Sequence, residues 1–192
     1  MKLWTIQPIE VVDILNEKGI FICNPNLSEN LNDEFSFTSA YNWLVKEMEK
    51  KIGKRPINVS FPIWAWHTEN GCHKKPDLRF SGHAKRGTKL VCIEIEVSDN
   101  EVVLSDFDAW HYVLNNSYFD DSKNEEEWEQ LHKWFDGLSP EQQEKEKIKS
   151  WHKIFDITKY KNDWASNGYF VQATCWELKK EYVKKLQYFT AK

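Results

Sequence analysis

The chain has 192 residues, with 26 Lys and Arg against 30 Asp and Glu, which gives a formal net charge of −4 at pH 7. This length predicts one domain over residues 1–192, and the charge balance argues against strong non-specific binding to nucleic acid. The ten Trp exceed what most cores of this size need, so we expect either an indole-rich core or a cleft that some of them line.

The first quarter of the chain alternates strand and helix patterns. KLWTIQ at residues 2–7 predicts a strand, and a helix is expected over 8–19, with Pro at its first position and Gly at its end. Residues 24–34 are rich in Asn and predict a loop. Residues 36–53 show apolar side chains at helical spacing, which predicts the clearest helix of the chain.

Strand patterns dominate the next part of the chain. NVSFPIWAW at 58–66 alternates between apolar and other residues, and Pro62 indicates an edge or bulged strand. The polar, turn-rich segment 67–89 separates it from LVCIEIEV at 90–97, which alternates again. A third short strand, VVL, is expected at 102–104.

The stretch LSDFDAWHYVLNN combines the end of a strand with the start of a helix. Ser105 precedes Asp108 by three residues, as in a capping box, so we expect Ser105 to cap a helix that begins near Asp106. Helix initiation accounts for both aspartates. It does not account for His111, which could bond within the core or point into a cleft beside Trp110.

The remaining segments are helical and then extended. Residues 122–155 are strongly charged, with capping boxes at Ser122 and Ser139, and predict a helical insertion that lies on the core. Residues 168–178 predict a strand, and a turn of helix then leads into a last short strand. The whole order predicts an α+β fold with a mostly antiparallel sheet and helices packed on it.

Composition also sets expectations about the compartment. The four cysteines are far apart, no N-terminal apolar run resembles an export signal, and no segment approaches the ~20 apolar residues of a membrane span. We therefore expect reduced cysteines in a soluble, cytoplasmic protein with no membrane partner. The oligomeric state cannot be predicted from the sequence.

One cluster of residues resembles a metal site. His67, Cys72 and His73 are close in sequence, and Cys92 could be a fourth ligand. Zinc sites usually take paired ligands from two loops, and the second pair is missing here. We expect no bound metal.

The segment from residue 74 to residue 86 is the most basic of the chain. Within it, Asp77 and Arg79 could form a structural ion pair, or Arg79 could hold a phosphate or carboxylate. Together with Trp64 and Trp66, the segment could bind a nucleotide or a single nucleic-acid strand by stacking and charge.

The late strand FVQATCW carries mixed polar and aromatic residues on one face. Gln172, Thr174 and Trp176 alternate along it, which predicts either a pocket lining or a solvated outer face. Glu177 follows at the strand end. The chain contains no P-loop, GxGxxG, GxSxG, HExxH or CxxC motif, which argues against the common ATPases, Rossmann enzymes, hydrolases and zinc proteins.

Several stretches together resemble one uncharacterised bacterial domain-of-unknown-function family over nearly the whole chain: MKLWTIQP, AYNWLVKEM, FPIWAWH with KPDLR, VVLSDFDAWHYVLNN and VQATCWELKKEYV. The family implies a similar length but no activity.

The layout also resembles small ADP-ribosyltransferase-type domains, through the first strand, the helix ending in ILNEKGIFI, and the late strand before ELKKEYVKKL. That resemblance implies an NAD cleft between two sheets and a late-strand Gln or Glu that stabilises the transition state. The candidates are Gln172 and Glu177, with Thr5 and Gln7 on the first strand.

Three functions remain open from the sequence. The first is an NAD- or nucleotide-binding enzyme of ADP-ribosyltransferase type. The second is a non-enzymatic module that binds nucleic acid. The third is a protein-interaction or regulatory domain whose charged helices at 122–155 meet a partner.

Overall fold

The computed structural model describes residues 1–28, 31 and 37–192. Residues 29–30 and 32–36 lie outside this description, and with them part of the predicted loop at 24–34 and the first residue of the helix predicted over 36–53. In the described part, no helix is long and apolar enough to cross a membrane.

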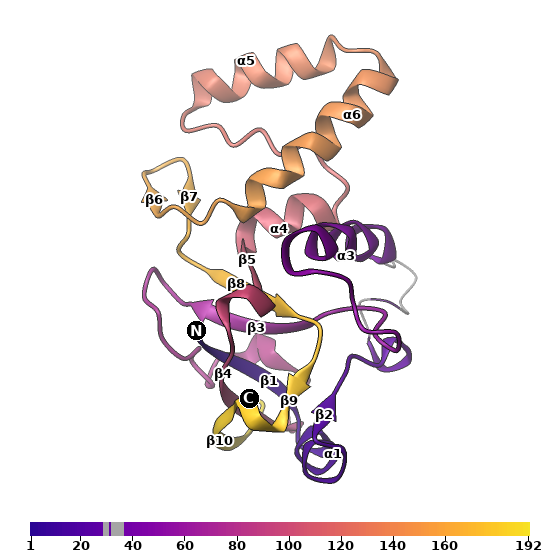
Figure 1. Cartoon of the computed structure of the whole chain (residues 1–192). Coiled ribbons are helices and arrows are strands. Elements are labelled where there is room, and N and C mark those ends of the chain that lie inside the picture. The colour runs from indigo at the N-terminus through magenta and orange to yellow at the C-terminus, as the bar shows by residue number, and fades with distance from the viewer. Residues whose placement is uncertain (29–30, 32–36) are drawn as a thin grey trace.

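The centre of the fold is a six-stranded sheet in which every pairing is antiparallel (Figure 1). In spatial order its strands are β10 (Val183–Thr190), β4 (Lys89–Glu96), β1 (Lys2–Pro8), β3 (Ile63–Thr68), β8 (Val171–Cys175) and β5 (Val103–Asp106). Two short pairs complete the extended structure: β2 (Ile20–Phe21) with β9 (Leu178–Lys179), and β6 (Tyr160–Lys161) with β7 (Ser166–Asn167). The predicted α+β class with a mostly antiparallel sheet is confirmed.

Helices cover the two faces of the sheet at different places. The helices are α1 (Glu10–Lys18), α3 (Thr38–Ile52), α4 (Phe107–Leu114), α5 (Glu125–Asp136) and α6 (Pro140–Ser150). Val11 and Leu15 of α1 pack in one core with Leu3 and Ala65, whose side chains point to one face. Leu44, Met48 and Trp110 from α3 and α4 pack in a second core on the other face, where Trp64 points.

The β1–β3 pairing is unusually short. The two strands are in register only at Trp4 and Trp66, whereas β1 pairs with β4 along its whole length from Lys2 to Pro8. Beyond Trp4 and Trp66, residues 5–8 of β1 are not in register with residues 63–65 of β3. Pro62 comes before the strand, so the predicted strand at 58–66 begins later than expected. The sheet is thus split in its middle.

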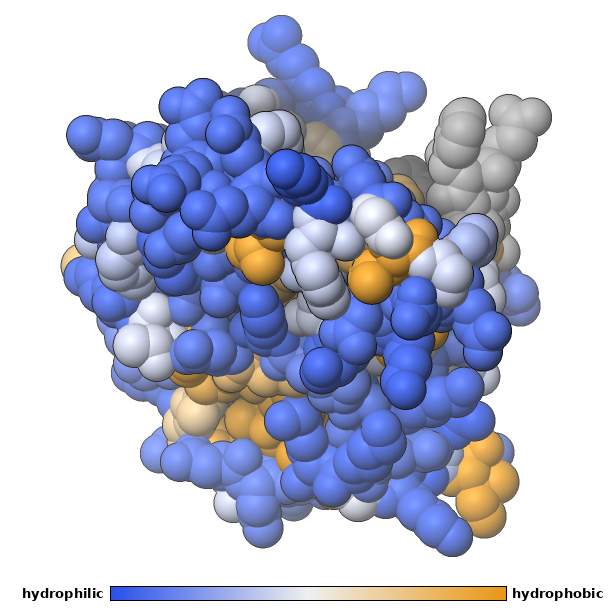
Figure 2. Space-filling model, turned by 90° about the horizontal axis from the view of Figure 1, so that it is seen from above, coloured by the Kyte–Doolittle hydropathy of each residue, from blue (hydrophilic) through white to orange (hydrophobic). Residues whose placement is uncertain are grey.

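Helices α5 and α6 of the charged insertion project from the sheet, whereas its last residues pack on the second core through Trp151 and Ile154, as expected. Helix α5 contains no buried residue, and α6 buries only Lys147 and Ser150 (Figure 1). From the end where these helices lie, the surface is mainly hydrophilic (Figure 2). The expected capping box at Ser139 is present, but α5 is capped by Asn124 and not by the predicted box at Ser122.

The opening of α4 differs from the prediction by one residue. Asp106, not Ser105, is the N-cap, and its carboxylate accepts a hydrogen bond from the Ala109 amide at 2.9 Å. Ser105 is the residue before it on β5, 1% exposed, with a hydroxyl that has no hydrogen-bond partner in the structure as described. The prediction of a Ser105 cap is therefore wrong.

Ser105→Ala is consequently expected to leave the free energy of unfolding unchanged or slightly higher. A capping serine would cost about 1 kcal/mol on removal, whereas removal of a buried hydroxyl without a partner relieves a desolvation penalty. Urea unfolding followed by circular dichroism measures the difference. A loss near 1 kcal/mol would show that the hydroxyl makes a stabilising bond, to an ordered water for example.

Candidate functional site

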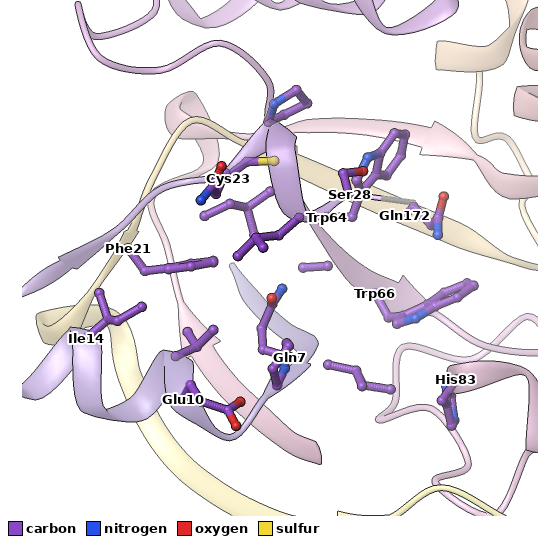
Figure 3. A pocket seen from close by; sticks show the side chains of 18 of the residues that line it. Gln7, Glu10, Ile14, Phe21, Cys23, Ser28, Trp64, Trp66, His83 and Gln172 are labelled. Atoms are coloured by element: carbon purple, nitrogen blue, oxygen red, sulfur yellow. The ribbon is translucent and has the colours of Figure 1, made fainter. Parts of the chain in front are cut away.

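A cavity of about 610 Å³ lies where β1 and β3 separate. Its walls come from β1, the start of α1, the segment after β2, the strand β3, and single residues of β8 and of the 3-10 turn at Ser81–His83 (Figure 3). Cavities of 300–1,000 Å³ with apolar walls and a few convergent polar groups are typical of small-molecule sites. The split in the sheet therefore produces the best candidate site.

Two indoles of β3 line the cavity, which corresponds to the second of the two alternatives that the Trp content left open. Trp64 also contacts Tyr41 and Trp110, and its indole nitrogen is buried without a hydrogen-bond partner in the described chain. Trp66 is partly exposed and contacts the ring of Phe107 at 5.3 Å. The Trp64 ring therefore packs against core side chains, whereas the Trp66 ring is more available for stacking on a ligand.

The first strand supplies a polar pair at the split. The Thr5 hydroxyl, which is fully buried, donates to the Trp64 carbonyl oxygen at 2.8 Å. Gln7 Nε2 donates to the same hydroxyl oxygen at 2.7 Å, and Gln7 lines the cavity. Thr5 therefore bridges the strands at the point where they separate, and only Gln7 faces the cavity.

Gln172, on β8, also lines the cavity. It pairs in register with Trp66 on one side and with Ser105 on the other, so these three side chains share a face. Its amide lines the cavity and makes no hydrogen bond within the described residues. Both glutamines named from the sequence are thus brought to one site.

Glu10, Cys23 and His83 also line the cavity, and the sequence analysis did not single them out. Glu10 lies in the first turn of α1, and His83 belongs to the basic segment. Burial raises the pKa of the Cys23 thiol, so this cysteine stays protonated at neutral pH and is no activated nucleophile. No sequence motif marks these residues, because they are brought together only by the fold.

Other predicted residues lie in the protein interior. Thr174 is buried and donates to the Val103 carbonyl at 3.4 Å, and the Trp176 indole donates to the Gly53 carbonyl at 3.2 Å. Trp110 is buried in the core under α3 and α4. Of the predicted face, Gln172 lines the β1–β3 cavity, Thr174 is buried, and Trp176 lines a smaller cavity elsewhere.

His111 does not point into the cavity. It is exposed on α4, its Nδ1 donates to the Phe107 carbonyl at 2.9 Å, and its ring contacts the Phe107 ring at 4.8 Å. On the same helix, burial and the neighbouring Asp106 carboxylate raise the pKa of Asp108. The start of α4 contacts Trp66 through Phe107 but does not line the cavity.

Glu177 lines a different, smaller cavity of about 190 Å³, together with Trp176, Glu101, Lys179 and Tyr182. In that cavity Tyr182 donates to the Glu101 carboxylate at 2.6 Å, which is the main cause of the lowered pKa of Glu101. Gln172 and Glu177 therefore do not meet in one site. The carboxylate on the wall of the β1–β3 cavity is that of Glu10.

The Asp77–Arg79 pair is a surface ion pair. The Arg79 guanidinium donates to both carboxylate oxygens of Asp77, at 2.7 and 2.9 Å, and these hydrogen bonds strongly lower the pKa of Asp77. Both residues line a shallow surface hollow with Lys74 and Lys75, away from Trp64 and Trp66. Arg79 is thus already neutralised by a partner.

The cluster considered for zinc is arranged around two stacked imidazoles. The His67 and His73 rings lie 4.3 Å apart, and their nitrogens bond the Thr68 hydroxyl and the Lys2 carbonyl oxygen. Burial, and then the neighbouring His73, lower the pKa of His67. Among the described residues, no three His, Cys, Asp or Glu side chains are grouped as metal ligands.

This geometry defines the class of the protein: an α+β fold with a split antiparallel sheet and a cavity lined by indoles and amides. The chain belongs to a family described as Domain of unknown function (DUF3841), whose model matches residues 2–184. No curated protein and no solved structure matches the chain. The family match confirms the first resemblance, and it gives no support to the ADP-ribosyltransferase likeness.

Proposed function

We propose that the protein binds a nucleotide, with NAD as the leading candidate, in the cavity between β1 and β3. The observation that carries the proposal is the split of the sheet, which places the Trp66 ring and the Gln7 and Gln172 amides on the walls of one cavity. An indole can stack on a flat ring, and an amide can fix the ring's edge.

The charge around the cavity supports a phosphate-bearing ligand. The basic segment reaches the wall at Gly82 and His83, and the exposed cations Lys85 and Arg86 follow within three residues. A nucleotide whose ring lies between the strands could extend its phosphates toward these cations. The one carboxylate of the wall, Glu10, lies on the opposite side at the start of α1.

For the catalytic part of the proposal, the reaction is cleavage at the glycosidic bond of NAD. The bond from ribose C1′ to the nicotinamide nitrogen breaks, nicotinamide leaves with the bonding electron pair, and a water or other acceptor bonds to C1′ and loses a proton. Positive charge develops on the ribose, so the Gln172 carbonyl oxygen would stabilise it. Gln172 is the late-strand residue available for this role, since Glu177 lines another cavity.

Titration of the protein with NAD tests the proposal. Saturable quenching of Trp fluorescence is expected, with a rise in melting temperature that corresponds to about 2.7 kcal/mol at a hundredfold excess over Kd. Gln172→Ala should weaken binding without unfolding the protein, because the amide makes no hydrogen bond in the described structure. Glu177→Ala is the matched control at the other cavity.

Two results would count against the proposal. The first is that NAD and mononucleotides up to millimolar levels leave fluorescence and melting temperature unchanged. The second is that Gln172→Ala and Glu177→Ala have equal effects on binding. Release of free nicotinamide over hours, measured by chromatography, tests the catalytic part separately from binding.

The nucleic-acid and protein-interaction hypotheses remain as alternatives. The pairing of Arg79 with Asp77 removes one cation from the proposed strand-binding surface. Binding of a single strand would weaken steeply with salt because it releases counterions, whereas stacking in an apolar cavity depends little on salt. Titration at two salt concentrations therefore separates binding of a nucleic-acid strand from binding of a nucleotide in the cavity.

A further inference from the structure

The Gln7 side-chain amide is held in one orientation by its neighbours. The Thr5 hydroxyl lies 2.8 Å from the Trp64 carbonyl oxygen, which can only accept a hydrogen bond, so the single hydroxyl proton is donated there. The hydroxyl oxygen then has no proton for Gln7, whose amide lies 2.7 Å away. Gln7 must therefore present its NH2 group to Thr5 and not its carbonyl oxygen.

This orientation decides what Gln7 offers to the cavity. The Oε1 atom makes no hydrogen bond to the part of the chain that is described, and one N–H of Nε2 is also left after the bond to Thr5. The side chain is partly exposed and its amide points from β1 into the space below β3 (Figure 3). The cavity wall thus carries a preset hydrogen-bond acceptor.

The Gln7 acceptor and the Trp64 wall of the cavity are connected by hydrogen bonds. Trp64 lines the same cavity, and its carbonyl oxygen anchors the chain of hydrogen bonds that orients Gln7. The Trp64 ring is in turn held by Tyr41 and Trp110. Because Thr5 is fully buried, little freedom remains for the amide to turn over.

We propose that Gln7 selects ligands whose ring carries an N–H group at its edge, as a primary carboxamide or an exocyclic amine, and rejects the carboxylate or keto analogues. The proposal rests on the proposed function and names the chemical group that the site reads. An N–H of the ligand donates to Oε1. A carboxylate or keto oxygen at that position places an acceptor against an acceptor, and the desolvated pair is left without a hydrogen bond.

Two matched pairs of mononucleotides test the selection and identify its source. Nicotinamide mononucleotide is compared with nicotinic acid mononucleotide, and adenosine monophosphate with inosine monophosphate, by Trp fluorescence at one pH and one salt concentration. The member with the carboxamide (nicotinamide mononucleotide) or with the exocyclic amine (adenosine monophosphate) is expected, in one of the two pairs, to bind about tenfold more tightly than its partner. The pair that shows the difference identifies which ring lies beside Gln7.

Three variants connect the preference to the hydrogen-bonded chain. Gln7→Met keeps the length of the side chain and removes its amide, so the ratio of the two dissociation constants should fall toward one. Thr5→Val removes the hydroxyl that orients Gln7 and should also reduce the ratio, whereas Thr5→Ser keeps the hydroxyl and should preserve it. A purely structural role of Thr5 would lower the melting temperature and leave the ratio unchanged.

The outcomes separate this inference from the proposed function. If no mononucleotide binds, the proposed function is contradicted and the selection by Gln7 with it. If they bind but both pairs show no preference or the opposite preference, only the selection is contradicted. A preference that survives in Gln7→Met also overturns it.

Discussion

Trp66→Ala is expected to weaken nucleotide binding about tenfold to a hundredfold. Stacking of a base on an aromatic side chain is worth about 1–3 kcal/mol, and Trp66, like Trp64, is a partly exposed indole on the cavity wall. Its neighbour Trp64 is unsuitable for this test, because it packs against Tyr41 and Trp110 and its removal would damage the core. Isothermal titration calorimetry with the best-binding nucleotide measures the change.

Trp134→Ala provides the matched control for this experiment. Trp134 is 46% exposed on α5 and does not line the β1–β3 cavity. The control should bind as tightly as the unchanged protein, and both variants should keep their melting temperatures within a few degrees. Equal affinities for Trp66→Ala and Trp134→Ala would place the ligand outside this cavity.

The largest effect on stability is expected for Asp106→Ala, at about 3 kcal/mol. One carboxylate oxygen accepts from the Ala109 amide at 2.9 Å and the other from the Gly168 amide at 2.7 Å, and the side chain is 1% exposed. The substitution leaves two buried N–H groups without a partner, each worth about 1–3 kcal/mol. Gly168 cannot move away freely, because its φ is +68° and it lies tightly against Ile157.

Asp108→Ala separates this effect from the general benefit of an acid at a helix start. Asp108 lies in the first turn of the same helix, and the described residues give its carboxylate no hydrogen bond. Burial and the Asp106 carboxylate, which raise its pKa, oppose the benefit of the helix dipole, so its loss should change the free energy of unfolding by less than about 1 kcal/mol. The free energy of unfolding of Asp106→Asn should lie between those of the two alanine variants, because the side-chain amide keeps one hydrogen-bond acceptor. Similar free energies of unfolding for Asp106→Ala and Asp108→Ala, measured in urea, would contradict a stabilising role of the two hydrogen bonds to Asp106.

The order of the main elements could be predicted from local periodicity. The alternation at 90–97 and the helical spacing at 36–53 correspond to β4 and α3, because each pattern depends only on which face is buried. The cap of α4 was misplaced by one residue for a related reason. Both Ser105 and Asp106 are good caps, and only the pairing of β5 with β8 decides where the strand ends.

The site was less predictable, because it depends on contacts between distant segments. Alternation correctly placed Gln172 and Thr174 on one face of β8, but it could not show that the helical core covers Thr174 and Trp176 and leaves Gln172 at the cavity. The early separation of β1 from β3 has no signature in either strand. The glutamines were found by residue type, and Glu10 and His83 were missed because their positions come from the fold.

The split between β1 and β3 sets the stability of the sheet against the proposed ligand binding. A sheet gains from each added ladder pair, and these two strands share a single register position although they lie side by side in the strand order. Mutations that extended the pairing from Trp4 toward Pro8 would strengthen the sheet and at the same time narrow the cavity. Selection for thermal stability alone would therefore tend to narrow the cavity. This corresponds to the general trade-off in which a binding region lowers the stability of the fold that contains it.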